Sequence, residues 1–427
     1  MSINTRWIYY LIVTGLILNG VFLLFSQINM DASQQATGAP VSTWYSQLGF
    51  IGNLLLTAAS ITSFALFYRR FPAFLSCCYI ALILIIAAMS APDLDQYLKA
   101  PSFFYMAKGL GSWINFGLLY FMADDHYSAR VFKIFKGLCY CFILFNLIKI
   151  VQFGAISNRE QAESAIRDTS VFLFWVYPFF FLSREDETPL FNAVKYGLMI
   201  FVLFFAFAIS SRSYTLIMAI FILVKVLRDI RHKENAAVMT VMGVLLCVGG
   251  GYLLLNIENF KSVNDLLTIF SGRINDDSRS SQLKEFFNQY NTDNLFKGVG
   301  ITGTWNWTGD KTGKYQWLDN QFVLITWWFG IETTFLYLCF VLTALFKKNV
   351  SGDRTVSNAK MLIFFWILAC AGFAIYATIS SNLFYYFITL MIGLVAINKK
   401  FITITLVKQD GVVFEPSIIN TTLQQKI

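Results

Sequence analysis

Charged residues are scarce in this chain: they make up 14% of its 427 residues, whereas hydrophobic residues make up 56%. A soluble domain carries about 25% charged residues, so this chain cannot wrap its apolar surface around one core and still present a hydrated exterior. The composition excludes a soluble globular protein and predicts a polytopic membrane protein.

Histidine is almost absent, with only His126 and His232, so a histidine-based metal site is not expected. The seven cysteines all fall in apolar runs, which argues against a disulfide framework or a metal cluster in the one long hydrophilic interval. That interval also has no Asp-x-Asp pair. Asp276 and Asp277 are adjacent and stand at the start of a predicted helix, where a carboxylate is typically a helix cap. We expect no metal and no cofactor.

Apolar runs of membrane-spanning length recur along the chain. Crossing about 30 Å of hydrocarbon takes roughly 20 helical residues. The runs lie near 7–25, 48–67, 73–91, 103–122, 131–153, 171–182, 191–210, 214–227, 236–255, 318–346, 361–379 and 383–397. They predict an all-α polytopic membrane protein with about twelve transmembrane helices and one large loop.

Four regions follow from these runs. Residues 1–257 would hold transmembrane helices 1–9, 258–317 the large loop, 318–397 helices 10–12, and 398–427 a cytoplasmic tail. Arg6 precedes the first run and no small-residue cleavage site follows it, which indicates a retained anchor.

Lysine and arginine gather in alternate short connections. If the N-terminus is cytoplasmic, the same side receives Arg69, Arg70, Arg130, Lys133, Arg184, Lys225, Arg228, Arg231, Lys233, Lys347, Lys348, Arg354, Lys360, Lys399 and Lys400. The rule that cytoplasmic loops are positive then predicts cytoplasmic termini and a periplasmic long loop. The weakest candidate for a membrane span is the run 171–182, which is short and contains Pro178. Omitting this span would put the later basic loops on the wrong side of the membrane. The net charge of +8 reflects this bias, and no nucleic-acid partner is expected.

The stretch 191–227 is too long for one crossing. As a single helix its 37 residues would reach about 55 Å, nearly twice the hydrocarbon core, so two spans joined at 210–213 are predicted. Arg212 then lies at the membrane surface, on the side of the long loop. It either snorkels to the interface or pairs with an anion.

One amphipathic helix is predicted in the large loop. Asp277 or Ser278 can cap it, and five residues share one face at helical spacing: Arg279, Leu283, Phe286, Phe287 and Tyr290. Arg279 either rests its stem on apolar neighbours or faces a cavity shared with Arg212. Arg273 lies just outside the helix and either joins these arginines or is solvated.

Arginines at a membrane surface suit a lipid-linked phosphate. Guanidinium groups bind phosphate oxygens bidentately and stay charged when desolvated, so they can hold a pyrophosphate leaving group without a metal. The match of 298–303 to G-x-G-x-x-G lacks a preceding strand, and these glycines are interpreted as a sharp turn. Trp305, Trp307, Tyr315 and Trp317 fit either sugar stacking or an interfacial belt.

The order of several short motifs resembles a family. It comprises Ser211-Arg212, Gly272-Arg273, Ser278-Arg279, an amphipathic helix, Phe296-Lys-Gly298-Val-Gly300, and Asp319-Asn320-Gln-Phe322 opening a span. The order looks like the superfamily of Wzy-type O-antigen polymerases and O-antigen ligases, which are GT-C-like membrane glycosyltransferases. The resemblance covers about 120 residues, from Arg212 to Gly330, and implies that the arginines engage the undecaprenyl pyrophosphate of the donor.

One departure from the family separates its two activities. A His-Asn pair commonly stands in the family where this chain has Asp319 and Asn320, and the histidine is the favoured general base of the ligases. Asp319 therefore favours a polymerase, in which its carboxylate accepts the acceptor hydroxyl proton; the alternative is a helix cap. Two further charged residues are accessory candidates for the site: Glu332, about three turns further along that span, and Lys108 in the fourth run. Alternatively, they form an ion pair with each other.

We therefore expect a bacterial inner-membrane polymerase of undecaprenyl-pyrophosphate-linked oligosaccharide repeats, such as O-antigen. Asp319 and Arg279 would be catalytic, Arg212, Arg273 and Arg279 would bind pyrophosphate, and Lys108, Asn320, Glu332 and Trp305 are accessory candidates. Its partners would be the lipid-linked oligosaccharides, the bilayer and a chain-length-determining membrane protein. An O-antigen ligase and a non-enzymatic oligosaccharide flippase are the alternatives.

Overall fold

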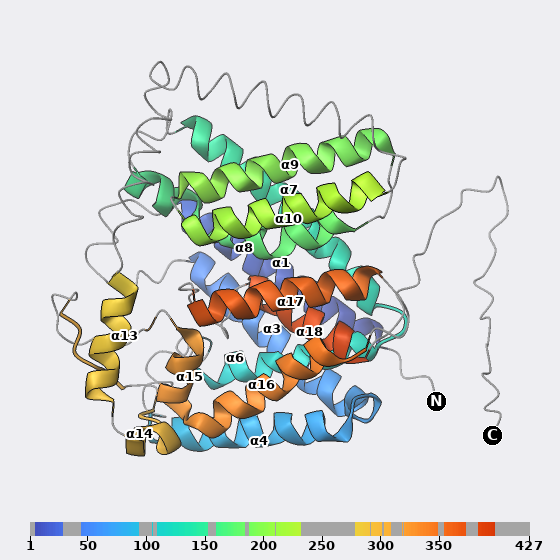
Figure 1. The fold of residues 1–427 in the computed structure, drawn as a ribbon. Coiled ribbons are helices and arrows are strands. Elements are labelled where there is room, and N and C mark those ends of the chain that lie inside the picture. Colours follow the sequence, from blue (N-terminus) through green and yellow to red (C-terminus); the bar gives the residue numbers. More distant parts are fainter. Residues whose placement is uncertain are drawn as a thin grey trace.

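Helices make up all the regular elements that the computed structural model describes. The description covers residues 5–28, 44–93, 105, 109–152, 159–183, 188–209, 211–231, 278–290, 292–300, 303–308, 318, 320–348, 354–372 and 383–397. Most of these helices run alongside one another in a bundle (Figure 1). The predicted all-α class is thus confirmed.

Six described helical stretches are long and apolar enough to cross a membrane. They are Arg6–Gln27, Trp44–Arg70, Ala73–Ser90, Ser128–Gln152, Ala165–Leu182 and Arg354–Ala371. The corresponding elements are α1 (Arg6–Ile28), α3 (Trp44–Phe67) with η1 (Tyr68–Arg70), α4 (Ala73–Ser90), α7 (Ser128–Gln152), α8 (Arg159–Leu182) and α17 (Arg354–Gly372). Shorter apolar helices cover Leu110–Ala123, Leu190–Ala206, Ile331–Phe346 and Leu383–Ile397.

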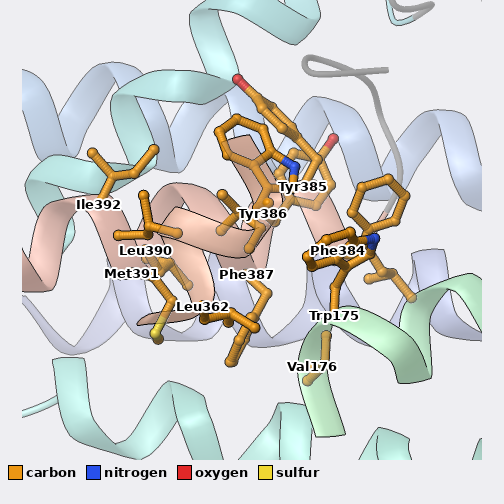
Figure 2. Packing of buried hydrophobic residues seen from close by; sticks show 14 of the residues in the cluster. Trp175, Val176, Leu362, Phe384, Tyr385, Tyr386, Phe387, Leu390, Met391 and Ile392 are labelled. Atoms are coloured by element: carbon orange, nitrogen blue, oxygen red, sulfur yellow. The ribbon is translucent and has the colours of Figure 1, made fainter. Parts of the chain in front are cut away.

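The helix α18 (Leu383–Ile397) occupies the centre of the bundle. Every residue from Leu383 to Ala396 is buried, as expected for a helix that is apolar all round. The Phe387 ring lies 5.0 Å from the ring of Phe135 in α7 and 5.5 Å from that of Phe179 in α8. Figure 2 shows Trp175 of α8 in the same packed cluster.

Two expectations about the middle of the chain are confirmed. The stretch 191–227 forms two helices, α9 (Pro189–Ala208) and α10 (Arg212–Arg231), joined by the short turn that the length argument predicted. The weakest run is part of α8, a 24-residue helix that retains Pro178 in its last turns.

The fourth apolar run, predicted as one span over 103–122, is not one continuous α-helix. Its described part changes at Phe116 from α6 (Leu110–Asn115) to the 3₁₀ helix η4 (Phe116–Ala123). The carbonyl of Ile114, at this change, accepts hydrogen bonds from the hydroxyls of Ser60 at 2.5 Å and Tyr79 at 2.7 Å. Side chains of α3 and α4 thus bond a carbonyl where the α-helix ends.

The run 318–346, predicted as one span, is also divided. The chain forms α15 (Gln321–Phe329), breaks at Gly330 with φ of 85°, and continues as α16 (Ile331–Phe346). Hydropathy cannot reveal this break because a glycine inside an apolar run hardly changes the average. The nine residues of α15 extend about 14 Å, too short to cross a bilayer.

Several hydrogen bonds define one end of the bundle, which we call the basic end. Arg70 pairs with Asp125 at 2.9 Å beside the end of η4, and Gly393 of α18 packs on the carbonyl of Leu119 in η4. Lys347 bonds the carbonyl of Ala396, at the end of α18. Further contacts there join Lys360 to the Lys347 carbonyl and Arg228 to Asn358.

Candidate functional site

A layer of short elements covers the end of the bundle opposite the basic end. It consists of α13 (Ser278–Gln289), α14 (Thr292–Lys297) and residues 303–308, which we call the cap. In Figure 1 α13 and α14 lie at the left, next to α15.

Phe286 fastens the cap to α15. Its side chain is 1% exposed, and its ring lies 5.5 Å from the ring of Trp305 within the cap and 5.6 Å from that of Trp327 in α15. Both pairs are edge-to-face, the favoured geometry for aromatic rings. Trp305, predicted as a residue that could stack on sugar, is 5% exposed and packs within the cap.

Of the residues predicted to share the packed face of α13, three do pack against the core and one does not. Phe286 is buried, and Leu283 and Tyr290 pack partly against the core. Phe287, however, is 55% exposed, and Gln282 is buried instead. Because α13 rests on one short helix, it buries a narrow stripe, and Phe287, about 100° round the helix from Phe286, lies outside it.

Polar contacts join α13 to residues 303–308. The Glu285 carboxylate accepts hydrogen bonds from the Thr308 N–H at 3.0 Å and from its hydroxyl at 2.7 Å. Because the Thr308 donors stabilise the charged form, the pKa of Glu285 is lowered. Gln289 donates to the Asn306 carbonyl at 2.7 Å and accepts from its N–H at 2.9 Å.

The glycines after α14 hold the cap against the end of α15. The N–H groups of Val299 and Gly300 donate to the carbonyls of Trp327 and Trp328, at 2.8 and 3.0 Å. Gly298 has a φ of 70°, and a Cβ there would lie 2.6 Å from the Trp328 oxygen. The predicted turn is therefore confirmed, and it also caps α15, a contact that the sequence did not predict. We call these contacts the glycine clasp.

Asn320 begins α15 and connects it to α17. Its side-chain oxygen accepts from the N–H groups of Phe322 and Val323, both at 3.1 Å, the geometry of an N-cap. Its amide nitrogen donates to the carbonyl of Ala371 at 2.8 Å. Asn320 thus fixes the start of α15 beside the last turn of α17.

The start of α10 lies at this same end. Arg228, near the end of α10, bonds Asn358 of α17 at 2.5 Å. Phe221 lies seven residues earlier in α10 and Phe365 seven residues later in α17, and their rings are 5.2 Å apart. The two helices are therefore antiparallel. The same step of seven residues pairs Tyr214, in the first turn of α10, with Gly372, the last residue of α17, so Arg212 begins α10 just beyond the level at which α17 ends.

The predicted site residues fall into three groups. The backbones of Arg212 and Arg279 lie in the first turns of α10 and α13. The other two predicted cations, Arg273 and Lys108, and the predicted base, Asp319, lie outside the described residues. Asn320, Glu332 and Trp305 are described in full.

Glu332 is not placed as predicted. It is exposed in the first turn of α16, and Gly330 separates it from α15. It therefore does not continue the helix that Asn320 begins. A carboxylate in the first turn of a helix interacts favourably with the helix dipole.

The sequence did not single out Gln282, Glu285 or Gln289, although all three lie on α13. Gln282 precedes Phe286 by four residues, a spacing that could have marked it as buried. The partners of Glu285 and Gln289 lie 17 to 23 residues away and leave no local pattern.

Among the described residues, no group of three His, Cys, Asp or Glu side chains is arranged to hold a metal ion. Comparisons of the chain with protein-family models, with curated proteins and with solved structures find no match.

Proposed function

We propose that this chain is a metal-independent membrane glycosyltransferase that polymerises undecaprenyl-pyrophosphate-linked oligosaccharide repeats. The growing glycan would be transferred from its carrier to the non-reducing sugar of an incoming lipid-linked repeat. Undecaprenyl pyrophosphate would be released.

One observation carries this proposal: the starts of α10 and α15 and the end of α17 all lie at the end of the bundle that the cap covers. Arg212 begins α10, and Asp319 directly precedes Asn320, the N-cap of α15. Phe286 docks α13, which has Arg279 in its first turn, on α15. The helices that begin with Arg212 and Asn320, and the helix that carries Arg279 in its first turn, thus lie at one end of the molecule, which supports the proposal.

These residue types suit transfer from a lipid diphosphate. In the proposed step the bond between the anomeric carbon and the pyrophosphate oxygen breaks, and a bond forms from that carbon to the acceptor hydroxyl oxygen. The Asp319 carboxylate takes the hydroxyl proton. Arg212, Arg279 and Arg273 hold the departing pyrophosphate and stabilise its charge by bidentate hydrogen bonds.

The proposal includes a topology. Twelve crossings with both termini cytoplasmic would put the basic end in the cytoplasm and the cap in the periplasm of a bacterial inner membrane. Lysine and arginine at the basic end support this orientation. Carriers in the outer leaflet would then reach the capped end.

The test is glycan laddering in cells that depend on this chain for surface polysaccharide. Arg279→Ala should abolish long polymer while single-repeat product persists. Lys284→Ala removes a cation from an exposed position of the same helix and should leave the ladder unchanged. Normal ladders from Arg279→Ala would reject the proposal, and long glycan retained on the carrier after deletion of the chain would identify a ligase instead.

A further inference from the structure

An exposed apolar stripe runs the length of α16. Ile331 is 39% exposed, Phe335 65%, Leu342 41% and Phe346 81%. Their spacing of four, seven and four residues places them on one face of the helix. In a bundle of membrane-spanning helices, such a stripe faces the hydrocarbon.

The short helix α14 lies at the outer end of this stripe. A Cβ on Gly330 would lie 2.3 Å from the carbonyl oxygen of Phe296, so the backbone of Phe296 packs against the residue that precedes Ile331. The side chain of Phe296 is 61% exposed, and that of Lys297 is also exposed. An exposed ring followed by a cation therefore stands where the lipid-facing surface of α16 begins.

We propose that α14 is an interfacial anchor: Phe296 inserts into the boundary between lipid acyl chains and headgroups, and Lys297 extends toward the lipid phosphates. This arrangement of an apolar ring and a snorkelling cation is typical of segments that lie in a membrane interface. The glycine clasp connects the anchor to α15: α14 ends at Lys297, and after Gly298 the N–H groups of Val299 and Gly300 donate to carbonyls of α15.

The bilayer, and not a second protein, is the occupant that the surroundings indicate, because the exposed ring continues a surface that already faces lipid. Phe287 provides the contrast. It is 55% exposed, close to the value for Phe296, but it lies on α13, and its ring neighbours are Phe286 of α13 and Tyr290, which follows that helix. We therefore expect Phe287 to face water.

The experiment is photo-crosslinking of the full chain in proteoliposomes of phosphatidylethanolamine and phosphatidylglycerol. Benzoylphenylalanine replaces Phe296, Phe287 or Phe335 in turn, and mass spectrometry measures the phospholipid adducts after illumination. The Phe335 position, in the middle of the stripe, is the positive control. Each replacement adds a benzoyl group to an exposed phenylalanine ring, and monodisperse size exclusion confirms folding.

The proposal predicts phospholipid adducts at position 296 several times more abundant than at position 287. Crosslinked dimers at position 296 without lipid adducts would identify a second copy as the occupant and overturn the proposal. Adduct yields at 296 no higher than at 287 would also overturn it. Neither readout depends on transferase activity, so the outcome is separate from that of the glycan-ladder test.

Discussion

Two apolar runs, each predicted as one span, are divided in different ways. At the change from α6 to η4 the extra donors are side-chain hydroxyls, from Ser60 and Tyr79, deep among the helices. At Gly330 the donors are backbone N–H groups of a segment outside the bundle, the glycine clasp. The first division is held by the bundle itself, whereas the second is held by the cap. Loss of the cap should therefore affect α15 and leave α6 and η4 in place.

The largest expected effect is at Phe286. Phe286→Ala opens a cavity between Trp305 and Trp327 and should weaken cap docking by about 3–5 kcal/mol. Protease cleavage within the cap should accelerate, while the thermal stability of the bundle changes little. The control is Phe287→Ala, at an exposed position of the same helix, which should stay within about 0.5 kcal/mol. Equal protease sensitivity of the two variants would contradict this account of docking.

Gly330→Ala should have the next largest effect. The positive φ is strained for alanine, and the new methyl group meets the Phe296 carbonyl, so we expect a destabilisation of about 2–3 kcal/mol. Hydrogen exchange at the Val299 and Gly300 amides measures it. Gly137→Ala is the control: Gly137 lies inside α7 with no atom within 4 Å of its Cβ position. That change should stabilise the helix by about 0.5–1 kcal/mol.

Tyr79→Phe tests the other division and should cost about 1 kcal/mol, since one hydrogen bond to the Ile114 carbonyl is lost and the Ser60 bond remains. Thermal unfolding in detergent measures the loss. Thr62→Ala removes a hydroxyl that bonds only within α3, and it should have less effect. A Tyr79→Phe loss no larger than that of Thr62→Ala would show that the hydroxyl does not support the change from α6 to η4.

The smallest effect concerns Glu285 and pH. Its pKa is lowered from the ordinary value of 4.5, so the contact with Thr308 contributes fully above that value and is lost as the pH falls through the lower, folded-state pKa. Exchange protection of the Thr308 amide should be constant near neutral pH and fall in acid. In Glu285→Gln this acid dependence should vanish. A Thr308 protection factor that is unchanged in acid would contradict the assignment.

The sequence predicts those features that depend on length, periodicity and charge. It locates the α9–α10 hairpin from the length of 191–227, and it identifies α13 and the burial of Phe286 from spacing. It predicts that a helix opens at Asp319-Asn320, and α15 does begin there with Asn320 as its N-cap. The role of Asp319 stays a prediction because that residue lies outside the described ones.

The features that the sequence misses depend on contacts between distant segments. Donors elsewhere in the chain bond the carbonyls beside the breaks at Phe116 and Gly330. Phe287 is exposed because α13 rests on a single short helix. The helix α14 was missed because six residues are too few to show a helical period. No local pattern reports any of these.

The most direct measurement is the binding of undecaprenyl pyrophosphate to the purified chain, which native mass spectrometry in detergent detects as a lipid-bound mass. We expect that the chain retains this lipid, that Arg212→Ala and Arg279→Ala each lose most of the bound fraction, and that Lys284→Ala retains it. Equal binding by all four proteins would contradict the claim that Arg212 and Arg279 together grip the diphosphate of a carrier lipid.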